Sequence, residues 1–512
     1  MLVATWKNGL LIVQLGRGGG VAGITAAQAL SNQSITDFVI VEYKDDIGGR
    51  MFHANFGEDA DGKPYTVELG ANWVQGLGTN GGPENPVWTF AQQYNISNTP
   101  SDYRSILTYN ETGPVDFTSL LDDFEDAYTS AEQHAGTILS ENLQDLSFRA
   151  GLYQAGWKPK RNMAAQAVEW WEWDWETSFP PEESSFVFGS TGYNLTFRQF
   201  SEANNFVTDQ RGFNTWLKGV ASTFLKPNDL RLRLNTTVTS ISHSDTGVTV
   251  VYEDGNCVKA DYAICTFSLG VLQNSDHLFS PKLPDWKETS IASFQMGTYT
   301  KIFLQFNETF WDKEKQFFLY ASPTTRGYFP VWQSLSTAGF HPDSNIIFAT
   351  VVGREAQRIE KQSFEATKAE LLAVLVQMFP DTTIPEPTAI LYPRWSTTPW
   401  SYGSYSNWPV GTTLETHENL RANVGRLYFA GEHTSAEYFG FLQGAWFEGR
   451  EAGERIAGMI AREGYGEGKG CRNPAGCGEY VRYEVLHGTT EREEYNAANG
   501  MGDSPFFVAG DK

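Results

Sequence analysis

The sequence contains few cysteines and few histidines, which argues against two classes of protein. Four cysteines among 512 residues are too few for a disulfide-held scaffold. Cys257 and Cys265 lie in strand-like segments and are expected to be packed thiols, whereas the spacing of Cys471 and Cys477 would permit a small disulfide loop. The eight histidines form neither an H-E-x-x-H motif nor a paired ligand spacing. A metalloenzyme is therefore not expected, and no metal ligand is predicted.

Basic residues and long apolar runs are also scarce. Thirty-eight Lys and Arg stand against 61 Asp and Glu, a formal net charge of −23. This argues against a general nucleic-acid binder, which needs a basic surface, and against binding to an anionic membrane surface. The longest apolar stretch, residues 371–379, is too short to span a bilayer and predicts a core helix. The acidic charge would attract a cationic small molecule, although it also serves solubility.

Apolar and aromatic residues are plentiful by contrast. They make up 41% and 14% of the chain, enough for large cores with rings left to line a pocket. Length alone suggests about three domain-sized units.

The first strong motif is a β-α-β unit at the start of the chain. A strand over residues 10–13, a glycine-rich turn, a helix over 24–30 and a strand over 38–41 follow one another. Gly18, Gly20 and Gly23 fit the G-x-G-x-x-G spacing, in which glycines let the backbone approach a pyrophosphate at a helix N-terminus. Residues 14–17 fit less well, because they interrupt the strand before the first glycine.

An acid and a second glycine pair strengthen the dinucleotide prediction. Glu42 ends the second strand, where a carboxylate binds a ribose hydroxyl and disfavours a 2′-phosphate. Gly48, Gly49 and Arg50 follow, so that an arginine could neutralise a phosphate.

Further along the chain, several segments predict regular structure. Strands are expected at residues 238–241, 248–252, 257–264, 298–306 and 427–430, with a turn at 254–255 and a helix at about 444–461. Residues 171–176 alternate tryptophan with acid. As a strand, this segment would place Glu172, Asp174 and Glu176 on one face. The chain after residue 464 is polar and glycine-rich, with little predictable structure.

These residues together resemble the flavin-dependent amine oxidase family, above all polyamine oxidases of plant and fungal type. The resemblance rests on the glycine motif and on six further segments in the same order. These are residues 68–74, 209–212, 266–272, 299–301, 406–411 and 431–435, the last followed by Gly444-Ala445.

The resemblance implies a mixed α/β fold with two discontinuous domains and FAD as cofactor. A Rossmann-like FAD-binding domain would comprise residues 1–95, 200–290 and 390–465. A substrate-binding domain with a mixed sheet and flanking helices would comprise 96–199 and 291–389, and 466–512 would be a tail. Ser404 stands where monoamine oxidases carry a flavin-linked cysteine, so the FAD should be non-covalent. The residues expected to contact FAD are Gly18, Gly20, Val21, Ala22, Gly23, Glu42, Gly49, Arg50, Gly70, Ala71, Asn72, Trp73, Val238, Trp395, Gly431 and Glu432.

The resemblance also implies roles in catalysis and in substrate binding. Lys301 would hold a water near flavin N5, and Glu176 would anchor a remote ammonium group. Two positions depart from the relatives: Gln75, where plant relatives often carry glutamate, and Phe441, where related enzymes carry tyrosine. The aromatic rings expected at the flavin and along the substrate are Trp73, Tyr299, Trp395 and Tyr405.

The implied reaction transfers a hydride from the amine α-carbon to flavin N5. The imine is hydrolysed to an aldehyde and an amine, and O₂ is reduced to hydrogen peroxide. Three alternatives stay open: an L-amino-acid oxidase on the same fold, a flavoprotein without amine turnover, and, less favoured, an NAD dehydrogenase. Six N-glycosylation sequons slightly favour secretion, although no signal peptide is readable before residue 10.

Overall fold

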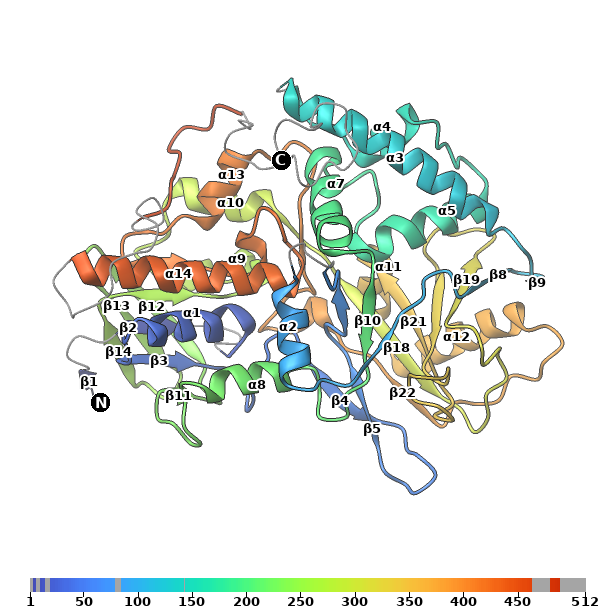
Figure 1. Cartoon of the computed structure of the whole chain (residues 1–512), viewed down its shortest axis with the longest axis horizontal. Helices are drawn as coiled ribbons and strands as arrows, with labels where there is room; N and C mark the ends of the chain where they lie inside the picture. The colour runs from blue at the N-terminus through green and yellow to red at the C-terminus, as the bar shows by residue number, and fades with distance from the viewer. Residues whose placement is uncertain are drawn as a thin grey trace.

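Two halves, one with two five-stranded β-sheets and the other with a seven-stranded sheet, lie side by side along the longest axis of the molecule (Figure 1). The computed structural model describes residues 3–5, 10–13, 19–78, 84–141, 143–462 and 479–488. Gly18, residues 14–17 and the Cys471–Cys477 pair lie outside the described residues. The arrangement confirms the predicted mixed α/β class.

The first sheet is the five-stranded parallel sheet that the β-α-β motif predicts. Its strand order is β11 (Leu232–Arg233), β3 (Phe38–Val41), β2 (Leu10–Val13), β15 (Ala263–Cys265) and β24 (Leu427–Phe429). Phe38 and Ile40 pack into the core that contains helix α1, whereas Val39 and Val41 belong to the core on the opposite face. Both faces of the sheet are therefore covered, as is usual for parallel sheets.

Helices α1 (Val21–Asn32) and α14 (Leu442–Arg462) run side by side on one face of this sheet (Figure 1). Two glycines of α14 permit this close approach. A Cβ on Gly449 would lie 2.1 Å from the carbonyl oxygen of Ala22, and one on Gly453 would lie 2.6 Å from that of Ala26. The packing of α14 holds α1 against the sheet and thereby fixes the position of its N-terminus.

A second sheet in the same half has the strand order β1 (Val3–Thr5), β14 (Cys257–Ala260), β13 (Gly247–Tyr252), β12 (Val238–Ser244) and β16 (Phe279–Ser280). The single strand predicted over 257–264 is wrong. The chain breaks at residues 261–262, and its two parts join different sheets, because β14 pairs with β13 while β15 pairs with β2 and β24. Cys257 and Cys265 are buried free thiols, as expected.

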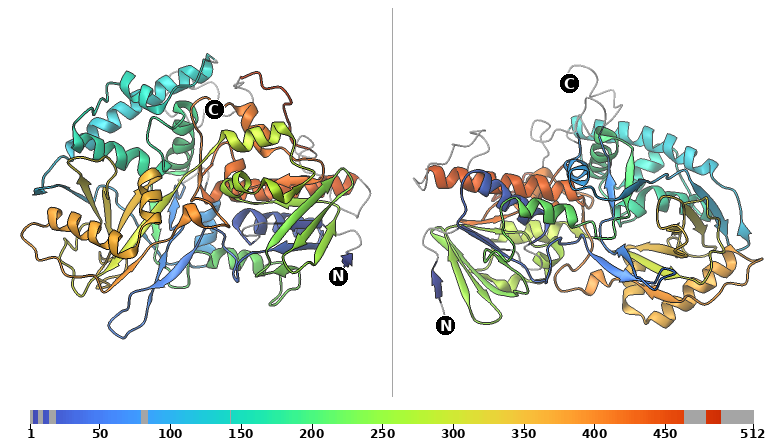
Figure 2. Two further views of the ribbon diagram at one scale, coloured as in Figure 1. Left: turned by 180° about the vertical axis from the view of Figure 1, so that it is seen from behind. Right: turned by 60° about the horizontal axis from the view of Figure 1, so that its bottom comes forward.

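The other half of the molecule is built on a mixed seven-stranded sheet. Its order is β22 (Ala389–Leu391), β18 (Tyr299–Gln305), β21 (Ile346–Val352), β20 (Val331–Ser334), β19 (Phe317–Ala321), β8 (Ile106–Asn110) and β9 (Gly113–Pro114). Helix α12 (Phe364–Met378), the core helix that the apolar run predicts, packs on one face. Helices α3 (Ser119–Ser140), α4 (Phe148–Gln154), α5 (Met163–Glu169) and α7 (Phe186–Asn194) lie on the other side (Figure 2).

The alternating Trp and acidic residues form a helix, so the predicted strand is wrong. Residues Trp170–Asp174 make a π-helical turn, η1, that continues into α6 (Trp175–Thr177). Trp171 and Trp175 stack at 4.6 Å, as i,i+4 neighbours on a helix can. The acids therefore do not share one face: Asp174 pairs with Arg326, whereas Glu176 points elsewhere. The ion pair between Asp174 and the distant Arg326 is compatible with a helix, although the alternation of Trp and acidic residues is typical of a strand.

A three-stranded sheet joins the halves, in the order β6 (Trp73–Gln75), β10 (Asn204–Val207) and β7 (Asn98–Pro100). Residues 479–488 have no regular structure, in keeping with the sequence, yet Tyr480 is buried against Arg421 and Arg455. No helix in the described part of the chain has the length and apolarity needed to span a membrane. The remaining elements are β4 (His53–Phe56), β5 (Tyr65–Glu68), α2 (Pro86–Gln93), η2 (Leu195–Phe200), α8 (Thr215–Ser222), α9 (Leu269–Asn274), η3 (Asp276–Leu278), α10 (Asp285–Ser293), β17 (Gln295–Met296), α11 (Gly353–Lys361), η4 (Trp395–Thr397), β23 (Ser406–Asn407), α13 (Leu414–Arg421) and η5 (Glu432–Thr434).

Candidate active site

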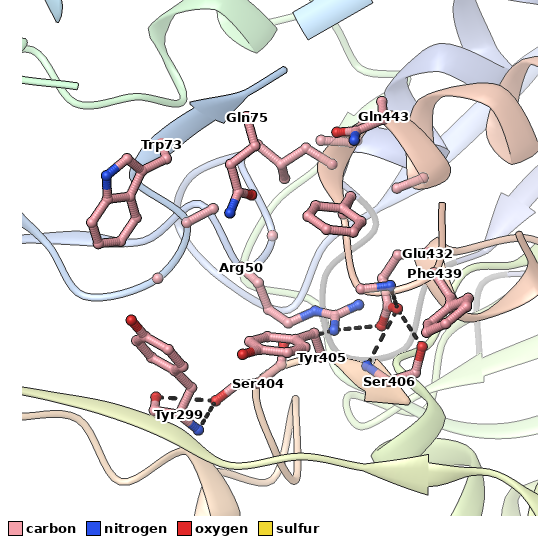
Figure 3. Close-up of a pocket in the computed structure, with 18 of the residues that line it drawn as sticks. Arg50, Trp73, Gln75, Tyr299, Ser404, Tyr405, Ser406, Glu432, Phe439 and Gln443 are labelled. Carbon is pink, nitrogen blue, oxygen red and sulfur yellow. Dashed lines mark hydrogen bonds and ion pairs between the residues drawn. The ribbon is translucent and has the colours of Figure 1, made fainter. Parts of the chain in front are cut away.

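A long pocket lies between the two halves and collects segments that are far apart in the sequence. It is lined by residues from the N-terminus of α1, from the 48–50 and 69–75 segments, from α6 and α7, from β18, and from the 395–407 and 431–445 segments. Figure 3 shows Trp73 and Tyr299 on one side of the pocket, with Arg50, Glu432 and Ser406 on the other. The pocket therefore has an aromatic part and a polar part.

The polar part begins at the N-terminus of helix α1. Gly20 caps this helix and has no side chain to accept from its first N–H groups, and its first turn carries no acid. Gly20, Val21 and Ala22 line the pocket, so the positive end of this helix faces the space where an anion would bind. Gly49 lies so close that a Cβ on it would be 3.1 Å from the Cα of Gly20. These groups fit the pyrophosphate of a dinucleotide.

Glu432 anchors the polar part through four hydrogen bonds. One carboxylate oxygen accepts from Arg50 at 2.7 Å, and the other accepts from the Ser406 hydroxyl at 2.5 Å, the Ser406 N–H at 3.3 Å and the Gly440 N–H at 2.8 Å (Figure 3). Burial alone would raise the pKa of Glu432, but Arg50 and the other partners lower it overall. The carboxylate is therefore ionised and holds the Arg50 guanidinium at the pocket wall.

Lys301 lies at the centre of the pocket on strand β18. Its side chain is buried, and its Nζ donates to the Gly70 carbonyl oxygen at 2.6 Å and to Asn72 Oδ1 at 2.5 Å. Burial lowers the pKa of this lysine, while the nearby Glu68 carboxyl opposes the shift. An ammonium group has three protons, so one position on Nζ remains after these two bonds. Lys301 can therefore hold or transfer a proton inside the pocket.

Aromatic side chains form the walls around Lys301. The Trp73 ring centroid lies 5.7 Å from Lys301 Nζ, and Trp73 meets Trp175 edge-on with centroids 5.6 Å apart. Tyr299 and Tyr405 face one another at 6.0 Å. Faces and edges of this kind suit an aliphatic chain that carries a positive charge.

Glu176 supplies the acidic group in this aromatic part. Its two carboxylate oxygens accept from Gln75 Nε2 at 3.0 Å and 3.2 Å, and its backbone carbonyl accepts from the Tyr405 hydroxyl at 2.8 Å. Burial raises the pKa of Glu176 to about 8, and the Gln75 hydrogen bond opposes the shift only partly. The carboxyl is thus poised to ionise when a cation binds beside it.

Ser404 connects the two parts of the pocket. Its hydroxyl donates to the Tyr299 carbonyl oxygen at 3.2 Å and accepts from the Tyr299 N–H at 2.8 Å, while its own carbonyl oxygen accepts from Arg50 at 2.8 Å. A serine hydroxyl cannot form the thioether that a cysteine at this position would make with a flavin.

The structure brings together most of the residues that the sequence predicts for the site. All eight residues predicted for catalysis and substrate binding line the pocket, Phe441 included. Of the predicted cofactor contacts, Gly23, Glu42 and Val238 do not line it, and Gly18 lies outside the described residues. Glu42 is close by, but its two oxygens accept from the N–H groups of Gly19 and Lys44 at 2.7 Å and 2.8 Å. Its ribose contact stays a prediction.

Other residues in or near the pocket were not identified from the sequence. Glu68 does not line the pocket but is buried behind it near Lys301, where it accepts from the Phe213 N–H at 2.6 Å; its place at the start of the 68–74 segment offered a signal. Tyr103 carried no recognisable signal. Within the described chain no group of three or more His, Cys, Asp or Glu side chains could hold a metal ion. The other unpredicted lining residues include Trp175, Tyr193, Ser406, Phe439 and Gln443.

Comparison with known proteins gives consistent matches over most of the chain. The profile of the family described as "Flavin containing amine oxidoreductase" matches residues 21–457. Polyamine oxidase 1 of Zea mays is 39% identical over 455 residues, which cover 85% of this chain and 88% of that protein. Polyamine oxidase 7 of Oryza sativa subsp. japonica is 39% identical over 448 residues, or 84% and 92% of the two chains. A solved structure of putrescine oxidase bound to putrescine shares the fold with a TM-score of 0.68, at 18% identity, over 90% of this chain and 100% of that one.

Proposed function

Because this chain belongs to the family of flavin-containing amine oxidoreductases and uses FAD, we propose that its substrates are polyamines. The observation that carries this proposal is the half-buried carboxyl of Glu176 within the aromatic part of the pocket. It offers a second, remote binding point to an amine that already has one nitrogen near Lys301. A monoamine has no second ammonium group to use it. The polyamine oxidases of maize and rice that this chain resembles support the same conclusion.

The cofactor would occupy the polar part and the centre of the pocket. The α1 N-terminus and Arg50 would hold the pyrophosphate, and Glu432 would fix Arg50 in place. Since Ser404 replaces a linking cysteine, FAD is held without a covalent bond. When bound, FAD would supply the redox chemistry, as acceptor of a hydride equivalent from the amine and donor of electrons to O₂. We further propose that the chain divides into two domains at the boundaries given in the sequence analysis. The half with the parallel sheet would hold FAD.

The protein's own residues would bind, orient and deprotonate the amine. Trp73, Tyr299 and Tyr405 would surround the aliphatic chain, which leaves little room for water. Lys301 would hold a proton or a water at Nζ. Because its pKa is lowered, the lysine side chain can take its neutral form near neutral pH. Glu176 would bind the distal ammonium and thereby place the reacting carbon.

The pocket fits an amino-acid substrate less well. A carboxylate on the substrate needs a free cation, and the basic side chains that line the pocket among the described residues are Arg50 and Lys301. Arg50 is ion-paired with Glu432, and Lys301 is bonded to Gly70 and Asn72. In the described part of the chain, the acidic side chains that line the pocket are Glu432 and Glu176, and Glu176 would repel a carboxylate.

Peroxide release from a panel of amines tests the proposal. Spermidine and spermine should give peroxide, whereas phenylalanine and benzylamine should give little. Anaerobic addition of spermidine should also bleach the flavin absorption band, because a binding protein without turnover would leave the band intact. Comparable peroxide release from phenylalanine and spermidine would contradict the proposal.

A further inference from the structure

A buried carboxylate lies behind strand β18, on the side away from the pocket. Glu360 belongs to helix α11 and is 1% exposed. It contacts Thr300, whose neighbours in the strand are Tyr299 and Lys301. Successive strand residues point to opposite faces, so Thr300 points away from the pocket that Tyr299 and Lys301 line. Glu360 therefore cannot touch a substrate or FAD directly.

The Glu360 carboxylate joins two segments that form different walls of the site. Oε1 accepts from the Thr300 hydroxyl at 2.6 Å and from the Trp395 N–H at 2.9 Å. Oε2 accepts from the Ser396 N–H at 2.7 Å and from the Ser396 hydroxyl at 2.5 Å. Thr300 and Trp395 are 95 positions apart in the sequence, so one side chain connects β18 to the start of η4.

These four bonds satisfy the carboxylate completely. A carboxylate has about four lone-pair positions, and each one here meets an N–H or O–H donor. The described ion pairs do not include Glu360, and all four donors to its carboxylate are neutral groups. A glutamine at position 360 would replace one carboxylate oxygen by an NH₂ group. That group would face two existing donors, and a buried donor without an acceptor is destabilising.

A second contact connects the same segments from the other direction. The Arg394 guanidinium donates to the Glu360 backbone carbonyl and, at 2.9 Å, to that of Gln362. Arg394 immediately precedes Trp395, whose buried ring lines the pocket and packs edge-on against Phe52 and Trp400. The end of α11 is thus bound to η4 through both its side chain and its backbone.

We propose that Glu360 is a positioning residue for the oxidation reaction. It holds the part of the pocket wall that contains Trp395 at a fixed distance from the strand that carries Tyr299 and Lys301. This distance lets the flavin and the amine meet in reactive geometry. The inference depends on the family's flavin chemistry and on the proposed roles of Lys301 and Trp395, but not on the choice of polyamine as substrate. Displacements of about 1 Å in such supports lower rates by about 100-fold.

The test compares Glu360→Gln with wild-type holoenzyme. The rate of flavin reduction by saturating amine, measured anaerobically by stopped flow, should fall by about 10- to 100-fold per bound FAD. The flavin absorption maxima should shift as well, because Trp395 and Lys301 move relative to the ring. Glu360→Asp, which retains both oxygens on a shorter side chain, should recover part of the rate.

Matched variants separate positioning from stability. Glu355→Gln, on the same helix but paired with Arg358 at the surface, should leave rate and spectrum unchanged. If Glu360→Gln yields no holoenzyme, Thr300→Val and Ser396→Ala are tested instead, because each removes one donor to the Glu360 carboxylate. Each should slow flavin reduction by about 3- to 10-fold. The proposal would be overturned if the variants that bind FAD showed wild-type reduction rates and spectra. It would also be overturned if their loss of activity only followed their loss of FAD. The assay uses whichever amine reduces the wild-type flavin fastest, so a failure of the polyamine assignment is seen separately.

Discussion

Gln75 Nε2 lies 3.0 Å and 3.2 Å from the two carboxylate oxygens of Glu176. The resemblance described above predicts glutamate at the position of Gln75. The pocket thus has one carboxyl and one amide where two carboxyls would otherwise meet, and the amide stabilises the ionised form of Glu176. This pair is the basis of the first two predictions.

Glu176→Gln should weaken polyamine binding and remove part of its pH dependence. The KM for spermidine should rise by about 10- to 100-fold with a smaller change in kcat, because a charge-assisted contact to a distal ammonium is lost. Steady-state kinetics check this change. Glu172→Gln is the control, since Glu172 lies on the same helical segment but does not line the pocket. An unchanged KM in Glu176→Gln would contradict the assigned role.

The pH dependence of stability has a defined sign. Burial raises the pKa of Glu176 from 4.5 to about 8, so the stability from its neutral form is complete below pH 4.5 and is lost as pH rises through 8. A bound ammonium favours the ionised form. The increase in Tm that spermidine produces should therefore grow between pH 6 and pH 8.5 in the wild type, and Glu176→Gln should reduce this growth.

Gln75→Glu should strengthen the binding of polyamines. Two carboxyls about 3 Å apart cannot both ionise readily, so one proton stays between them until a cation binds. The KM for spermine should fall by about 3- to 10-fold, with a larger effect above pH 8. Gln75→Ala removes the amide without adding charge, and its KM should not fall. An increase in KM for Gln75→Glu would indicate that the amide itself contacts the substrate.

Lys301→Met should impair the reaction more than substrate binding. The variant removes the one lysine that lines the pocket among the residues that the structure describes, and it leaves Gly70 and Asn72 without the Lys301 donor. We expect kcat to fall by about 100-fold or more, in the range of positioned proton-transfer groups. Turnover with spermidine measures this effect. Lys259→Met, at an exposed position of β14, is the matched control and should keep the wild-type rate.

Arg326 should stabilise the π-helical turn that leads to Glu176. Its guanidinium binds both Asp174 oxygens at 2.6 Å and Glu169 at 3.0 Å. Arg326→Met leaves buried Asp174 without its ion-pair partner, whereas Glu169 keeps Arg149 and Trp157, and the loss should lower the free energy of unfolding by about 3 kcal/mol. The KM for spermidine should rise as the turn loosens.

The control for this prediction is an exposed ion pair. Arg354 pairs with Glu183 but its side chain is 90% exposed, so Arg354→Met should cost about 0–1 kcal/mol. Urea unfolding of both variants measures the two costs. Equal losses of stability would contradict the special role of Arg326.

Local sequence patterns predicted the elements whose causes are local. The apolar strands β2, β3 and β24, the glycine-rich entry to α1 and the apolar run of α12 are all encoded within a few neighbouring residues. The resemblance to the family also identified eight catalytic and substrate-binding residues, all of which line the pocket, and three of them lie in the ordered segments.

The prediction failed where distant partners decide the outcome. The alternation over residues 171–176 suggested a strand, but Arg326 draws Asp174 to one side while Gln75 meets Glu176 on another. The break in the 257–264 run follows from pairing with two different sheets. Such partners lie up to about 150 positions away, beyond the reach of any local period.

By itself, the sequence determined the parallel-sheet dinucleotide fold, the flavin amine oxidoreductase family and a set of site residues most of which line the pocket, because glycine spacing, apolar periodicity and short ordered segments are local properties. Only the tertiary structure decided that Glu176 is held by Gln75, that Glu432 is bonded to Arg50, and that Glu360 ties Thr300 to Trp395. These contacts depend on which buried donor meets which buried acceptor, and that choice is made when distant segments pack together.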